Sequence, residues 1–196
     1  MNITRCGMIS QVWSSRDVAY IVLFSALSVV NLATVVQFFS IVVPVPGIGY
    51  GVDIIGAILG GVAFLLYRGR RWRLLAQGTL IALLTMPFTI GGLAAGNIIV
   101  RIPIILRALI LDVVFMSFYG SFKRRNKLLW LTILQLLFFF TVGPFIGMLF
   151  FSLFIPFELL WPIYFSVLLM LPLIIVLTII GGYTGYKIYE RVEKIA

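Results

Sequence analysis

Two arginines stand inside an otherwise apolar stretch and could bind an anion. Arg101 and Arg107 begin and end the segment "RIPIILR", and the next charge along the chain is Asp112. Charged groups among apolar residues usually face a ligand, water or a partner charge. A carboxylate or phosphate on a small molecule would suit Arg107, and so would an ion pair with Asp53, Asp112 or Glu158.

Arg107 and Asp112 are poorly placed to neutralise each other. Five residues apart on one helix, their side chains point about 140° apart, so each needs another partner. We expect Asp112 to have a structural role, or to be protonated, rather than to bind a ligand.

Further polar and aromatic residues gather near the predicted outer ends of the apolar segments. They are Tyr50, Asp53, Asn97, Glu158, Trp161 and Tyr164. One interpretation is a pocket open to the outside, in which rings stack on a planar ligand and polar groups orient it. The other is a belt of Trp and Tyr that anchors the protein at the lipid interface. In the first interpretation these residues, with Arg101 and Arg107, form the substrate site.

Residues for catalysis are scarce. The chain contains no histidine, which excludes His-dependent lipid phosphatases and proteases with an HExxH motif. It also has no GxSG-like serine motif and no acidic cluster that would hold Mg²⁺ and a diphosphate. Because a Walker A motif is absent as well, energy from ATP would have to come from another chain. We expect no enzyme activity, no metal site and no cofactor.

The composition indicates an integral membrane protein. Of the 196 residues, 62% are hydrophobic and 11% charged, and the mean hydropathy is +1.17, far above soluble domains that are roughly half apolar. Uncharged runs fill the chain between Asp17 and Asp53 and from residues 74 to 100, 128 to 157 and 159 to 186. Each run exceeds the roughly 20 residues that an α-helix needs to cross a bilayer.

These runs, with two shorter segments, predict an all-α fold with six transmembrane helices in one bundle. The predicted spans are about 16–43, 52–67, 73–89, 102–119, 128–153 and 163–186. The alternating ten-residue segments of a transmembrane barrel are absent from the sequence. We therefore expect residues 1–196 to form a single membrane domain.

The basic residues predict the orientation in the membrane. Short loops rich in Lys and Arg stay in the cytoplasm, and placing both termini there puts 13 of the 15 basic residues inside. Only Arg101 and Arg107 then lie toward the outside. The net charge of +9 is explained by this topology, so we do not expect nucleic acid as a partner.

Small residues recur along the first predicted helix. Ala19, Ala26 and Ala33 are spaced by seven, and Ser25 lies beside them. Small residues on one face let another helix approach closely in a membrane. That helix could belong to the same bundle or to a separate membrane subunit.

Four segments together resemble the substrate-binding S components of energy-coupling factor (ECF) vitamin transporters, and the resemblance covers most of the chain. They are "SSRDVAYIVLFSALSVV", "PVPGIGYGVDIIGAILGG", "YRGRRWR" and "IIGGYTGYKIYERVEK". The resemblance implies six helices in the plasma membrane of a bacterium or archaeon. It also implies high-affinity capture of a vitamin-like molecule at an outer site built from loops and the last three helices.

The resemblance further implies three partner chains, namely a transmembrane coupling subunit and two ATPases. The family docks to the coupling subunit through an Ala-xxx-Ala pattern in the first helix. Val22 and Ala26 occupy the matching positions here, with Ala19 and Ser25 nearby. The nickel and cobalt members carry a histidine-bearing N-terminus, which this chain lacks, so an organic substrate is expected.

Two alternatives stay open at the level of the sequence. One is a different transporter or channel for small solutes, although such transporters are usually longer and built from repeats. The other is a structural subunit of a membrane complex that binds no ligand. The structural alternative predicts that Arg101, Arg107 and Glu158 pair with protein groups rather than line a cavity.

Overall fold

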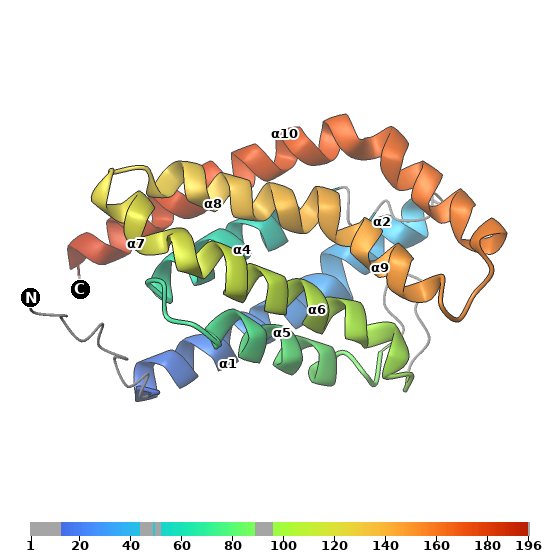
Figure 1. Cartoon of the computed structure of the whole chain (residues 1–196), viewed down its shortest axis with the longest axis horizontal. Helices are drawn as coiled ribbons and strands as arrows, with labels where there is room; N and C mark the ends of the chain where they lie inside the picture. The colour runs from blue at the N-terminus through green and yellow to red at the C-terminus, as the bar shows by residue number, and fades with distance from the viewer. Residues whose placement is uncertain (1–12, 44–48, 50–51, 89–95, 196) are drawn as a thin grey trace, which may run out of the picture.

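The computed structural model describes residues 13–43, 49, 52–88 and 96–195, and every regular element among these residues is a helix. The prediction of an all-α fold is confirmed for this part of the chain. Six helical rods lie side by side along the long axis of the molecule within the described residues (Figure 1).

Three of the rods are single α-helices: α4 (Ile54–Leu66), α5 (Arg73–Leu84) and α10 (Phe157–Ile195). The other three each contain a π-helical segment. They are α1 (Ser15–Asn31) with η1 (Leu32–Val36) and α2 (Gln37–Val42); α6 (Ile102–Ile110) with η3 (Leu111–Phe115) and α7 (Met116–Arg124); and α8 (Leu128–Leu137) with η4 (Phe138–Val142) and α9 (Gly143–Phe151). A short 3₁₀ turn, η2 (Ile99–Arg101), precedes α6.

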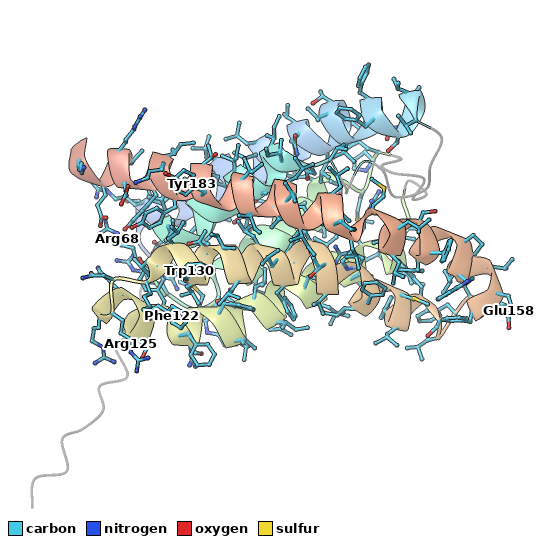
Figure 2. The ribbon with its side chains drawn as sticks, turned by 90° about the horizontal axis from the view of Figure 1, so that it is seen from above. Arg68, Phe122, Arg125, Trp130, Glu158 and Tyr183 are labelled. Carbon is cyan, nitrogen blue, oxygen red and sulfur yellow. The ribbon has the colours of Figure 1, made fainter. Side chains whose placement is uncertain are left out.

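The rods alternate in direction. The start of α1, the turn between α7 and α8, and the end of α10 share one end of the bundle, whereas the turn between α9 and α10 lies at the other (Figure 1). Arg68 and Arg125 lie at the first end and Glu158 at the second (Figure 2). The bundle therefore has one strongly basic end.

Three helical segments are long and apolar enough to cross a membrane: Ser15–Val42, Leu128–Phe151 and Phe157–Lys194. Helices α4 and α5 are apolar but shorter. Large apolar side chains such as Ile41, Leu149 and Leu153 are more than two-thirds exposed on the outside of the bundle, a surface that suits lipid better than water. The chain therefore has the features of a membrane protein, and the crossing of all six rods stays a prediction.

Glycines allow α4 and α10 to pack closely. A Cβ atom on Gly181 would stand 2.6 Å from the Ala57 Cβ, and one on Gly185 would stand 2.9 Å from the Ile58 carbonyl oxygen. Since lipid offers no hydrophobic drive for helices to associate, close approach through small residues is a main source of stability. Helix α4 also packs against α1 and α8, so it is the central element of the bundle.

The basic turn between α4 and α5 is held by acidic residues from other rods. Arg70 donates to both carboxylate oxygens of Asp17 at 2.9 Å, and Arg73, which is 0% exposed, donates to the same carboxylate at 3.1 Å. Asp112 accepts from the backbone N–H groups of Trp72 and Leu75, both at 2.7 Å. These bonds fix the turn against α1 and η3.

Candidate functional site

A chamber of about 140 Å³ lies within the bundle. It is bordered by α1, α4, α5, α6 and α8 and by all three π-helical segments. The lining residues are Ser28, Asn31, Leu32, Asp53, Gly56, Gly60, Leu74, Gln77, Gly78, Ile81, Ile104, Arg107, Ala108, Leu111, Gln135, Leu136, Phe139 and Phe140. The wall is thus mostly apolar and contains a few polar side chains, the usual composition of a small-molecule site.

Asp53 and Asn31 join two rods at the chamber wall. Asp53 precedes α4, and its carboxylate accepts the Gly56 backbone N–H at 2.7 Å as an N-cap. The Asn31 side-chain amide of α1 donates to the same carboxylate oxygen at 2.7 Å. Both residues are buried, so the pair holds a polar group where apolar side chains would otherwise pack.

Two carboxamide oxygens of the lining residues have no hydrogen-bond partner among the described residues. They are Oδ1 of Asn31 and Oε1 of Gln135, and the two residues are only 4% and 2% exposed. Most buried polar atoms in folded proteins have a partner, either protein or ordered water. The two oxygens therefore mark places where a further donor would be stabilised.

Arg107 brings a positive charge to the chamber. Its guanidinium carbon lies 5.6 Å from the centre of the Phe139 ring, within the range of a cation–π contact. A Cβ atom on Gly143 would stand 2.7 Å from the Arg107 Cδ, so glycine at 143 leaves room for the arginine side chain. The chamber accordingly holds one positive and one acidic side chain, Arg107 and Asp53.

All three π-helical segments contribute to the wall. Leu32 comes from η1, Leu111 from η3, and Phe139 and Phe140 from η4. Short π-helical segments inside α-helices are often found at functional sites, because the extra residue redirects the side chains that follow. Their location on three separate rods around one chamber is a second reason to consider it the functional site.

Of the eight predicted substrate-site residues, Asp53 and Arg107 line the chamber. Arg101 does not line it, although it is 1% exposed. Its guanidinium donates to the carbonyl oxygens of Thr85 and Phe88 at 3.0 and 2.7 Å. Arg101 thus satisfies backbone groups where α5 ends.

Four more of the predicted residues, Asn97, Glu158, Trp161 and Tyr164, do not line the chamber. Asn97 is exposed and accepts the Ile99 backbone N–H at 3.0 Å. Exposed Trp161 lies between the rings of Phe157 and Phe165.

Glu158 and Tyr164 belong to the same stretch of α10. Glu158 is exposed at the end opposite the basic residues (Figure 2). Tyr164 is buried beside Phe145, with ring centres 6.3 Å apart. Tyr50 lies outside the described residues.

Three chamber residues, Asn31, Gln77 and Gln135, were not among the predicted site residues. All three are buried amide side chains in apolar helices, and Gln77 accepts from the Tyr67 hydroxyl at 2.9 Å. Uncharged polar residues in a membrane helix tend to face protein rather than lipid. That tendency was the signal in the sequence that could have identified them.

The predicted docking residues of α1 divide between two faces. Ala19, Val22 and Ala26 are exposed, and so is Ala33, seven residues after Ala26 in η1. Ser25 is 0% exposed, and its hydroxyl donates to the Gln77 carbonyl oxygen at 3.3 Å. The small-residue stripe is therefore not buried within this bundle, while Ser25 holds α1 against α5.

Comparisons of the chain with models of known protein families, with curated proteins and with solved structures found no match.

Proposed function

We propose that this protein is the substrate-binding S component of an ECF-type importer. The observation that carries the proposal is the chamber, a partly enclosed space with buried polar groups inside an otherwise apolar helical bundle. A subunit with a purely structural role has no need of such a space, because tight packing would stabilise it more.

In this proposal the chamber holds a vitamin-like organic molecule taken from outside the cell. Arg107 and Asp53 provide charges of opposite sign, and the apolar wall excludes water from the bound molecule. The chain lacks a nucleotide-binding motif, so release to the cytoplasm is driven by two ATPases through a coupling subunit.

The exposed stripe of Ala19, Val22 and Ala26 supports this assignment of partners. These residues leave a shallow apolar strip on α1, against which a helix of the coupling subunit can pack closely. Bilayer lipid is the other neighbour of this face when the subunit is not docked.

We further propose that all six rods cross the plasma membrane of a bacterium or archaeon. The basic turns at one end of the bundle (Figure 2) favour a cytoplasmic location of that end. Helices α4 and α5, with 13 and 12 residues, extend only about 20 Å each at 1.5 Å per residue. Their flanking turns would therefore lie within the membrane thickness, where Asp17, which pairs with both Arg70 and Arg73, stabilises the charges.

The test is to identify small molecules that accompany the protein. The chain is purified in mild detergent from membranes of its own host, denatured, and the released compounds are analysed by mass spectrometry against a mock purification. We expect one organic compound in near-stoichiometric amount. If no compound is enriched and no ATPase or coupling subunit is recovered from gently solubilised membranes, the proposal is wrong.

A further inference from the structure

The two unpartnered carboxamide oxygens carry information about the bound molecule. Asn31 belongs to α1 and Gln135 to α8, so they approach the chamber from different rods. Both are nearly completely buried, and neither oxygen has a donor among the described residues. A molecule in the chamber that supplies two donors would give Asn31 Oδ1 and Gln135 Oε1 each a hydrogen-bond partner.

The orientation of Asn31 is determined by its neighbour. Its amide nitrogen donates to the Asp53 carboxylate at 2.7 Å, which leaves the Asn31 oxygen as the acceptor. The adjacent carboxylate adds negative potential at this part of the wall. Such a wall favours N–H and O–H groups and disfavours a second anion.

The size of the chamber limits the size of the molecule. Its volume is about 140 Å³, and an apolar cavity of about 150 Å³ accommodates a benzene-sized molecule. The rings of Phe139 and Phe140, with centres 5.1 Å apart and nearly perpendicular, form part of the wall. A single ring fits this volume, and a fused multi-ring compound would extend beyond it.

We propose that the chamber binds a single-ring polar molecule that donates at least two hydrogen bonds, one to Asn31 and one to Gln135. Arg107 at the same chamber favours an acceptor on that molecule, so a ring carboxamide has the right combination of groups. This inference rests on the proposed function, because it names the substrate class of that same site.

Three probes of similar size separate the chemical alternatives. Benzamide has N–H donors and a carbonyl acceptor, benzoate has acceptors only, and toluene has neither. Each is added at millimolar concentration to the detergent-purified full chain, and the shift in thermal unfolding is measured. We expect benzamide to stabilise the protein and the other two to have much smaller effects, because a site with hydrogen-bond acceptors rejects analogues that lack the donor.

Two variants and one control test whether the benzamide shift arises from binding in the chamber. Gln135→Leu removes the acceptor with little change in shape, and it should weaken benzamide binding about tenfold. The control is Thr132→Val, because Thr132 lies on the same helix, bonds the Leu128 carbonyl and does not line the chamber. Ile104→Phe fills the chamber without removing a polar group and should abolish the benzamide shift even if Gln135→Leu does not fold.

The inference is overturned if benzoate or toluene stabilises the protein as much as benzamide does. It is also overturned if none of the three probes produces a shift, since the chamber then holds only water. The proposed function is judged separately, by the compound released from the host-derived protein. Release of a large or purely anionic compound would reject this substrate class and leave the S component assignment standing.

Discussion

Arg101 and Arg107 carry the same charge six residues apart, yet their surroundings differ. Arg101 bonds two backbone carbonyl oxygens at the end of α5, whereas Arg107 lines the chamber and contacts the Phe139 ring. A buried arginine that satisfies carbonyl groups stabilises the fold, whereas one at a cavity wall brings its positive charge close to a bound molecule. Arg101 therefore has a structural role, and Arg107 is the candidate for binding.

We expect opposite results for the two alanine variants. Arg101→Ala leaves the Thr85 and Phe88 carbonyl oxygens without this donor, and it should lower thermal stability by about 1–3 kcal/mol. Arg107→Ala should reduce the content of the co-purified compound at least tenfold, while the protein stays monodisperse in gel filtration. If Arg107→Ala aggregates and Arg101→Ala loses the compound instead, the assigned roles are reversed.

Asp17 holds the basic turn between α4 and α5. It is 3% exposed and accepts from both Arg70 and fully buried Arg73. Removing one partner of a buried ion pair leaves the other charge uncompensated, which usually destabilises by about 3–5 kcal/mol. We expect Asp17→Ala to lose stability on this scale in an SDS unfolding titration.

The matched control for Asp17 is Glu190→Ala. Glu190 forms an exposed ion pair with Lys187 at 2.7 Å, and exposed pairs contribute little. Equal losses of stability for Asp17→Ala and Glu190→Ala would contradict a special role of the ion pairs that Asp17 forms with Arg70 and Arg73.

At the scale of the helices, small residues lie both on the outer face of α1 and on the inner face of α10, but these two faces have different neighbours. Gly181 and Gly185 of α10 contact α4 within the chain, whereas Ala19 and Ala26 of α1 are exposed. Adding volume to the first pair should disturb the fold. Adding volume to the second should disturb only a contact with another molecule.

We therefore expect Ala26→Leu and Gly185→Leu to behave differently. Gly185→Leu places a side chain against the Ile58 carbonyl and should lower thermal stability clearly, by about 2 kcal/mol or more. Ala26→Leu should leave the unfolding temperature within a degree or two and reduce recovery of the proposed coupling subunit in pull-downs from host membranes. Normal recovery with Ala26→Leu would show that the subunit docks elsewhere.

The sequence predicted where helices occur better than how they face one another. The predicted breaks at residues 68–72 and 120–127 contain the turns between α4 and α5 and between α7 and α8, although α7 continues to Arg124, further than predicted. The predicted break at residues 44–51 lies almost wholly outside the described residues. Helix α1 begins with a capping box in which Ser14 and Asp17 exchange two hydrogen bonds at 3.2 Å.

The composition of the chamber was less evident, because it depends on the rotation of each helix about its axis. The π-helical segments change that rotation partway along three rods, and nothing in the local sequence signals them. Asn31 and Gln135 were not predicted because they carry no charge, whereas Asp53 and Arg107 were included for their charge. The expected contribution of the last three helices is also only partial, since no described residue of α10 lines the chamber.

At the scale of the whole molecule, the distribution of charge predicts which end faces the cytoplasm. The turn at Arg125 belongs to the basic end, and Ser152 lies at the opposite end, between α9 and α10. Both residues are exposed, so each can report on the side of the membrane by cysteine labelling. Cys6 is the only native cysteine and is first replaced by serine.

In that background, we expect a membrane-impermeant maleimide to label Ser152→Cys in intact cells and Arg125→Cys only after the cells are lysed. The physical reason is that loops with several Lys and Arg residues are retained on the cytoplasmic side, and Lys123, Arg124 and Lys127 remain after the substitution. Labelling of both sites after lysis serves as the control for accessibility. If Arg125→Cys reacts in intact cells and Ser152→Cys does not, the orientation is inverted and the proposed cytoplasmic location of the basic end is wrong.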